Sequence, residues 1–114
     1  MSYKNVVAWQ KAMDLVVQVY SDTKSLPEEE RFGLQSQMRR SATSIPSNIA
    51  EGYGRGGTTE YIRFVDISLG SLRELQTQIE LAERLEMMNG TKLEAQADEV
   101  GKILYSLRKG LKER

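Results

Sequence analysis

Hydrophobic positions recur every three or four residues in four separate segments of this 114-residue chain. Such spacing places apolar side chains on one side of an α-helix. The positions in the first segment are Val6, Trp9, Met13, Val16, Tyr20 and Thr23, widened by Ala12 and Val19. Those in the second are Leu34, Met38, Ala42, Ile45 and Ile49. Those in the third are Tyr61, Val65, Ser68, Leu72, Leu75, Ile79 and Ala82, flanked by Phe64, Leu69 and Leu85. Those in the fourth are Leu93, Ala97, Val100, Leu104, Leu107 and Leu111. The pattern predicts four amphipathic helices.

Short stretches rich in turn-forming and capping residues separate these segments. Pro27 ends the first helix, because the residue before a proline avoids helical angles. We expect the second helix to begin within residues 28–30, three glutamates suited to a helix N-terminus, and to end near Gly52 and Gly54.

The last two helices carry predicted N-terminal caps. Thr58 or Thr59 follows two glycines and is the expected N-cap of the third helix. Thr91 and Glu94, which come directly after Asn89-Gly90, match a capping box for the fourth.

The order of elements predicts an all-α fold. Short connections force consecutive helices to run antiparallel, which gives an up-down-up-down four-helix bundle. The near-heptad spacing favours shallow, left-handed crossing. Neither an internal repeat nor a linker interrupts the pattern, so residues 1–114 are expected to form a single domain.

Pro46 lies inside the second predicted helix. A proline there removes one backbone hydrogen bond and crowds the carbonyl four residues earlier, at a cost of about 3 kcal/mol in a regular helix. We therefore expect a kink. The kink either wraps the helix around the core or positions the polar residues beside it.

Those polar residues form a stripe. Arg40, Ser44, Ser47 and Glu51 share one helix face, and Asn48 adjoins it. The stripe fits ordinary solvated surface, a subunit contact or a ligand-binding face, although helix propensity would not choose such residues for plain surface.

Gly70-Ser71 interrupts the middle of the third helix. Glycine in a helix interior costs about 1 kcal/mol relative to alanine. The two small residues indicate close packing, either against the second helix or against a neighbouring subunit.

Charge is unevenly distributed although the chain is neutral overall, with 16 basic and 16 acidic residues. Two basic zones contain Arg31, Arg39, Arg40, Arg55 and Arg63, and Lys102, Arg108, Lys109, Lys112 and Arg114. An acidic zone between them contains Glu74, Glu80, Glu83, Glu86, Glu94, Asp98 and Glu99. The zones fit complementary subunit contacts, arginine–phosphate contacts or solvated faces.

The residue types needed for most catalytic and metal sites are missing from the sequence. The chain has no histidine and no cysteine, which removes the commonest general base and the commonest soft metal ligands. Glu80, Glu83 and Glu86 have a spacing that fits an exposed helix face better than a metal site. We therefore expect no catalytic residue, no metal and no cofactor. Lacking an apolar membrane span or a signal-peptide pattern, the chain is expected in the cytoplasm.

Four strings carry a family resemblance: VAWQKA at 7–12, LQSQMRRSA at 34–42, SIPSNIAEG at 44–52 and GSLREL at 70–75. With these motifs, spread over nearly the whole chain, the sequence resembles the ribosomal RNA (23S rRNA) intervening-sequence proteins. The resemblance implies an antiparallel four-helix bundle, typically assembled as a homopentamer. The family name describes where some members are encoded and not an activity.

A more distant resemblance links the chain to the accessory variability protein of diversity-generating retroelements, which partners a reverse transcriptase and binds nucleic acid through basic surface. That relative is strongly basic, whereas this chain is neutral. The residues expected to bind nucleic acid or a partner are Arg39, Arg40, Arg55 and Arg63, and those expected to orient them or to seal a subunit contact are Ser44, Asn48 and Glu51.

Two functions follow as hypotheses. The first is a non-catalytic, homo-oligomeric scaffold that binds RNA or a nucleic-acid enzyme through the arginines of the second helix. The second is a purely structural protein–protein interaction module that binds no nucleic acid. An enzyme with a small-molecule substrate is not expected.

Overall fold

A computed structural model describes residues 2–114, and four α-helices account for most of them. They are α1 (Val7–Asp22), α2 (Leu34–Gly54), α3 (Thr58–Arg84) and α4 (Thr91–Lys112). Three short 3-10 turns, η1 (Tyr3–Asn5), η2 (Thr23–Ser25) and η3 (Glu28–Glu30), lie near the N-terminus and between α1 and α2. The described range contains no strand, which confirms the all-α prediction.

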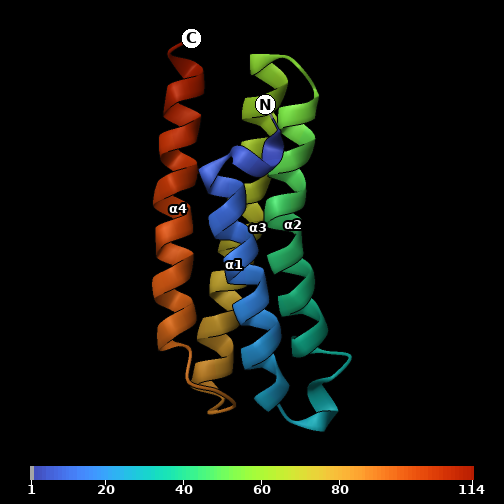
Figure 1. The fold of residues 1–114 in the computed structure, drawn as a ribbon. Helices are drawn as coiled ribbons and strands as arrows, with labels where there is room; N and C mark the ends of the chain where they lie inside the picture. Colours follow the sequence, from blue (N-terminus) through green and yellow to red (C-terminus); the bar gives the residue numbers. More distant parts are fainter. Residues whose placement is uncertain (1) are drawn as a thin grey trace.

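Consecutive helices run in opposite directions along a bundle of 46 × 21 × 19 Å, as Figure 1 shows. Each helix packs on two neighbours: α1 on α2 and α4, and α3 on α2 and α4. Within residues 2–114, α1 and α3 are diagonal to each other and make no close backbone approach. The bundle therefore has the predicted up-down-up-down order.

The predicted apolar faces of α2, α3 and α4 are buried almost without exception. Met38, Ile45, Leu72, Ile79 and Leu104 are fully inaccessible to solvent, as expected for side chains on the core side of each helix. Leu107 is half-buried. Leu85 lies just beyond α3 and is 53% exposed, so it belongs to the surface.

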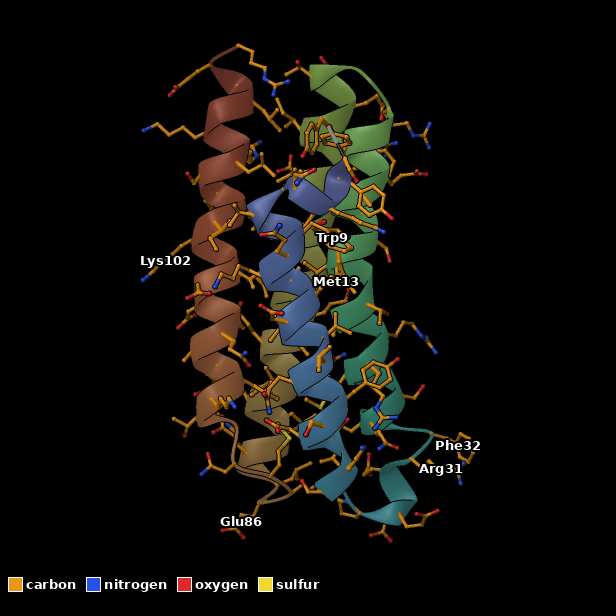
Figure 2. The ribbon with its side chains drawn as sticks, in the orientation of Figure 1. Trp9, Met13, Arg31, Phe32, Glu86 and Lys102 are labelled. Atoms are coloured by element: carbon orange, nitrogen blue, oxygen red, sulfur yellow. The ribbon has the colours of Figure 1, made fainter. Side chains whose placement is uncertain are left out.

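The predicted face of α1 is partly wrong. The core receives Ala8, Ala12, Leu15 and Val19, whereas Met13 and Tyr20 are 37% and 41% exposed. In Figure 2, Trp9 and Met13 lie on the side of α1 that is turned toward α2. The apolar residues of α1 are spaced so that they fit two overlapping helix faces. The face that contains Ala8, Ala12, Leu15 and Val19 packs in the core, and the face that contains Met13 and Tyr20 is partly exposed.

Three predicted helix starts are corrected by the structure. The glutamates at 28–30 form η3 and not the start of α2, and the Oε1 of Glu30 accepts a hydrogen bond from the backbone N–H of Leu34 at 3.0 Å. Gly57, not a threonine, is the N-cap of α3. The capping box at Thr91 does not form: the N-cap of α4 is Gly90. The backbone N–H of Thr91 instead donates to Oδ1 of Asn89 at 3.0 Å.

Helix α2 continues through Pro46, whose side chain is buried. The hydroxyl of Ser68 on α3 donates to the carbonyl of Ile45 at 2.9 Å, and the hydroxyl of Ser47 donates to the carbonyl of Thr43 at 2.8 Å. Side-chain hydroxyls from two helices thus bind carbonyls in the helical turn that precedes the proline. The kink itself and the left-handed crossing stay predictions.

The two small residues in α3 separate in the structure. The side chain of Ser71 is buried, and its Oγ lies 2.8 Å from Oγ of Ser44 on α2. Gly70 is exposed, and a Cβ added there would meet no atom within 4 Å. Close packing on α2 therefore involves Ser71 and not Gly70, while a neighbouring subunit at Gly70 stays a prediction.

A search of the described residues for a helix long and apolar enough to cross a membrane finds none.

Candidate partner-binding surface

The polar stripe of α2 is partly tied to α3. Asn48 donates from Nδ2 to the carbonyl and to Oγ of Ser44, at 2.8 and 3.0 Å. Ser44 in turn bonds Ser71. Asn48 and Ser44 are half-buried, whereas Ser47 and Glu51 are exposed. The inner half of the stripe therefore joins two helices, and its outer half faces solvent.

Arg55 and Arg63 lie together near the junction of α2 and α3. Arg55 forms an ion pair with Glu51 at 3.2 Å, and Arg63 forms one with Glu60 at 3.0 Å. Their guanidinium carbons lie 5.2 and 4.6 Å from the centre of the Phe64 ring. Each arginine therefore has a carboxylate partner within the chain, in a pair that is about half exposed to solvent.

Arg39 is bound to α1. Its Nε donates to Oγ1 of Thr23 at 3.0 Å and its terminal nitrogen donates to the carbonyl of Tyr20 at 3.2 Å. Its guanidinium carbon also lies 4.5 Å from the centre of the Tyr20 ring, a cation–π distance. A positive charge near the C-terminal end of α1 is favourable for the helix dipole. Arg39 therefore fixes α2 against α1.

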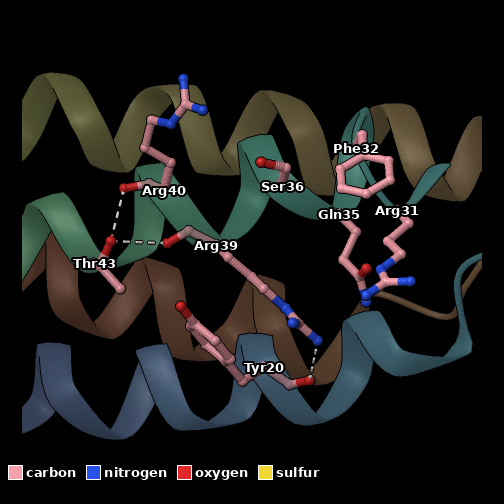
Figure 3. Close-up of a pocket in the computed structure, with 8 residues that line it drawn as sticks. All are labelled: Tyr20, Arg31, Phe32, Gln35, Ser36, Arg39, Arg40 and Thr43. Atoms are coloured by element: carbon pink, nitrogen blue, oxygen red, sulfur yellow. Dashed lines mark hydrogen bonds between the residues drawn. The ribbon is translucent and has the colours of Figure 1, made fainter.

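Arg40 is exposed, and no ion pair holds it among the described residues. Figure 3 shows its guanidinium extending away from α1, in the opposite direction to that of Arg39. The two neighbouring arginines thus have different environments: one is anchored and the other is free to meet a ligand.

A shallow cavity of about 390 Å³ lies beside them, between α1 and the start of α2 (Figure 3). None of its lining residues is acidic. They are Tyr20, Arg31, Phe32, Gln35, Ser36, Arg39, Arg40 and Thr43, and we call this set the arginine pocket. An acidic residue does lie nearby, since Glu28 is 3.9 Å from Arg31, but both side chains are largely exposed. Such a pair contributes little binding energy.

Phe32 is the most exposed large apolar side chain in the described range, at 88%. Figure 2 shows it projecting from the turn before α2 next to Arg31, whose guanidinium carbon lies 5.4 Å from the ring centre. The sequence pattern did not select Phe32 as a site residue. The available signal was an aromatic residue outside every apolar face, directly after an arginine.

The four predicted arginines do not form one patch. Arg39 and Arg40 line the arginine pocket, while Arg55 and Arg63 flank Phe64. Arg40 lies on α2 and Arg55 caps its C-terminal end, so the two are 15 positions apart, which at 1.5 Å per residue is about 22 Å along the axis. Folding instead brings Arg31 to the first pair.

The chain also matches a known family. The model of the 23S rRNA-intervening sequence protein family matches residues 4–106. This chain belongs to that family. A crystal structure of a protein of unknown function from the S23 ribosomal protein family of Bacteroides thetaiotaomicron is similar in fold, with a TM-score of 0.82. It is 27% identical, and the match covers 90% of this chain and 96% of that one. Among curated proteins, none matches.

The string at 44–52 of this 23S rRNA-intervening sequence family member has a structural explanation. Ile45, Pro46 and Ile49 are buried in the core. Gly52 contacts α3 so closely that a Cβ there would lie 2.7 Å from Cβ of Phe64. The motif therefore packs α2 on α3, and only Ser47 and Glu51 within it are exposed.

Three residues of the acidic zone of this family member gather at the junction of α3 and α4. Carboxylate oxygens of Glu80, Glu83 and Glu94 lie within 4.8 Å of one another. A hydrogen bond with Glu83, together with burial and neighbouring negative charges, raises the pKa of Glu94. Glu86 lies outside this group, in the turn after α3 with a φ of 56°. Because exposed carboxylates gather without a metal in many proteins, this cluster alone carries no metal assignment.

Proposed function

We propose that this chain is a non-catalytic, homo-oligomeric scaffold that binds RNA or a nucleic-acid-processing partner through the arginine pocket. The observation that carries the proposal is a concave surface with three arginines and no carboxylate in its lining. Planar guanidinium groups bind phosphate oxygens through two parallel hydrogen bonds. The proposal assigns the protein to the cytoplasm, with no catalytic residue, no cofactor and no small-molecule substrate.

The arrangement of the three arginines supports phosphate binding. Arg39 is held by two hydrogen bonds, so part of its conformational entropy is lost before any ligand binds. Arg31 and Arg40 are exposed and adjust to the ligand. Ser36 and Gln35 add hydrogen-bonding groups to the same lining. A ligand with several negatively charged oxygens fits this set best.

Exposed apolar residues on two diagonal helices support self-association. Val17 on α1 is 67% exposed, and on α3 Ile67 and Leu81 are 39% and 46% exposed. Two different apolar surfaces on opposite corners of a bundle suit head-to-tail contacts, which close into a ring when the rotation allows it. A pentameric ring, the assembly typical of similar proteins, would place one arginine pocket on each subunit, and simultaneous binding of one RNA by several pockets would raise the overall affinity.

A salt titration of RNA binding tests the proposal. Binding of the native protein to a structured RNA should weaken linearly on a log–log plot of affinity against salt, as expected when phosphate contacts release counterions. Arg40→Glu should weaken binding at all salt concentrations and make the slope shallower by about one unit. Lys102→Glu is the matched control, because this exposed lysine lies on α4, away from the pocket (Figure 2).

The outcome of the titration separates the two hypotheses. Equal affinities and slopes for native protein and Arg40→Glu would contradict the proposal. An intact oligomer that binds no RNA at low salt would favour the second function, a purely structural interaction module. The ion pairs of Arg55 with Glu51 and of Arg63 with Glu60 favour that alternative, because these arginines already have partners.

A further inference from the structure

We infer that the arginine pocket binds single-stranded nucleic acid, with an unpaired base stacked on Phe32 and the flanking phosphates bound by Arg31 and Arg40. This inference rests on the proposed function and names the class of nucleic acid. Two features carry it: the exposed ring in the pocket lining, and the exposed guanidinium groups of Arg31, which has a long and solvent-exposed ion pair with Glu28, and of Arg40.

The exposure of Phe32 has no explanation in folding. Its ring is 88% exposed, and it lies outside the buried core cluster. Leaving a phenylalanine in water forgoes about 1.5–3 kcal/mol that burial would provide. The residue sits in the turn before α2, where a polar side chain would serve the backbone equally well.

The neighbours of Phe32 determine which ligand fits. Arg31 lies 5.4 Å from the ring centre, and most of the other residues that line the pocket are polar or cationic, which favours a charged ligand over a purely apolar one. Nucleic acid offers the required combination, since a flat base stacks on the aromatic ring while phosphates bind the arginines. Base–aromatic stacking of this kind contributes about 1–3 kcal/mol per base.

The accessibility of the base decides between single-stranded and double-stranded nucleic acid. In a duplex both faces of each base are covered by neighbouring pairs, so a ring at the protein surface meets only the backbone. Unpaired bases present a free face, and aromatic side chains combined with a basic groove bind single strands for this reason. A duplex or an RNA hairpin stem would use the arginines alone.

The pocket is also backed by rigid structure. Arg39 and Gln35 donate to Thr23 and Tyr20 at the end of α1, so the floor of the pocket is fixed by hydrogen bonds between two helices. The exposed ring and the exposed side chains of Arg31 and Arg40 line the same pocket, and Arg40 extends away from α1 (Figure 3). A nucleic-acid strand in the pocket would therefore contact one side that is fixed by hydrogen bonds and the exposed side chains of two arginines.

Two probes of equal phosphate number test the inference: a single-stranded oligouridine and a duplex of the same charge. Anisotropy titrations should show tighter binding of the single strand by the native protein. Phe32→Leu should weaken single-strand binding by about fivefold or more and leave duplex binding unchanged, because leucine is apolar but has no aromatic face. Phe32→Tyr, which keeps the ring, should bind like the native protein. All three proteins should fold, since this side chain is 88% exposed.

A direct signal for stacking comes from Phe32→Trp. The native chain has a single tryptophan, Trp9, which serves as the reference emission. Addition of oligouridine should quench the introduced tryptophan in Phe32→Trp and leave the emission of the native protein nearly unchanged. Addition of poly-glutamate, an acidic polymer without bases, should quench neither.

Several results would overturn the inference. They are equal binding of single strand and duplex, equal binding by Phe32→Leu and Phe32→Tyr, or competition by poly-glutamate as effective as that by oligouridine. A change in oligomer mass in Phe32→Leu, measured by light scattering in the same samples, would assign the ring to a subunit contact. If Arg40→Glu still weakens RNA binding in these cases, the proposed function survives while the single-strand inference fails.

Discussion

At the scale of single residues, neighbouring side chains of one type have different roles. Arg39 and Arg40 are adjacent in sequence, but Arg39 donates to Thr23 and Tyr20 while Arg40 is exposed. Helical geometry separates consecutive residues by about 100°, so one points to the α1 side of α2 and the other to solvent. Only Arg40 is therefore free to bind a ligand without loss of an internal contact.

This difference predicts unequal effects on stability. Arg39→Met should lower the free energy of unfolding by about 1–2 kcal/mol, because it removes two hydrogen bonds to α1 and its C-terminal turn and the cation–π contact with Tyr20. Arg40→Met should change it by less than about 0.5 kcal/mol, as for other exposed positions. Urea unfolding at one fixed protomer concentration measures both. A larger loss in Arg40→Met than in Arg39→Met would contradict this assignment of roles.

Glu94 predicts a dependence of stability on pH. Its raised pKa is caused first by the hydrogen bond with Glu83, then by burial and by the charges of Glu83, Glu80 and Asp98. The folded state thus holds this proton more tightly than the unfolded chain. The resulting stabilisation is present below the ordinary glutamate pKa and is lost as the pH rises through the raised value.

Glu94→Gln mimics the protonated form at every pH. It should therefore be more stable than the native protein at about pH 7.5, and the difference should shrink toward about pH 4.5. Urea midpoints across this range give the measurement. Glu74→Gln, an exposed carboxyl elsewhere on α3, is the control and should show no such trend. A constant difference at all pH values would refute a role for the Glu94 titration.

At the scale of elements, the contact between α2 and α3 depends on small residues at defined positions. The Oγ atoms of Ser44 and Ser71 are 2.8 Å apart, and Gly52 lies directly against Phe64. Gly70 is also in α3 but faces open space. The same residue type is thus required by packing at one position and not at the other.

Alanine substitutions separate the two glycines. Gly52→Ala should destabilise the fold by about 1–3 kcal/mol, because its Cβ would lie 2.7 Å from Cβ of Phe64 and 3.1 Å from Cδ1 of Tyr61. Gly70→Ala should stabilise the isolated bundle by about 0.5–1 kcal/mol, since alanine favours the helix and meets no atom. Thermal unfolding measures both. A destabilised Gly70→Ala with a lower oligomer mass would instead reveal a subunit contact at Gly70.

At the scale of the whole molecule, two helices that are diagonal to each other, α1 and α3, both carry exposed apolar residues. On α1 they include Met13, Val17 and Tyr20, and on α3 they include Ile67 and Leu81. The junction of α3 and α4 carries the acidic cluster of Glu80, Glu83 and Glu94. Head-to-tail association through the two apolar corners would leave the arginine pocket of each subunit next to an interface.

Charged substitutions at the two corners test this assembly. Val17→Glu and Ile67→Glu should each reduce the oligomer mass, because a buried unpaired carboxylate costs several kcal/mol at an interface. Ala95→Glu, an exposed position on α4, should leave the mass unchanged. Light scattering with circular dichroism distinguishes dissociation from unfolding. A native protein that is monomeric at all concentrations would contradict the scaffold proposal.

The sequence determined the class of the fold, because three of its four apolar faces have a single helical interpretation. The buried positions of α2, α3 and α4 follow from spacing alone, as does the antiparallel order that short connections impose. It also indicated close packing at the Gly70-Ser71 pair, and it offers no histidine or cysteine to a site. These are local properties, set by residue type and by distance along the chain.

Only the tertiary structure decided which face of α1 is buried, since its apolar residues exceed what the core can hold and packing chooses among them. The structure also decided the environments of the arginines, because an ion pair or a hydrogen bond depends on the neighbouring helix. In the folded structure Arg55 and Arg63 form ion pairs with carboxylates, and Arg39 forms a hydrogen bond with α1. Arg40 lines the same pocket as Arg31 and Phe32. Periodicity locates a side chain on its own helix, whereas its partners come from elements that only folding brings together.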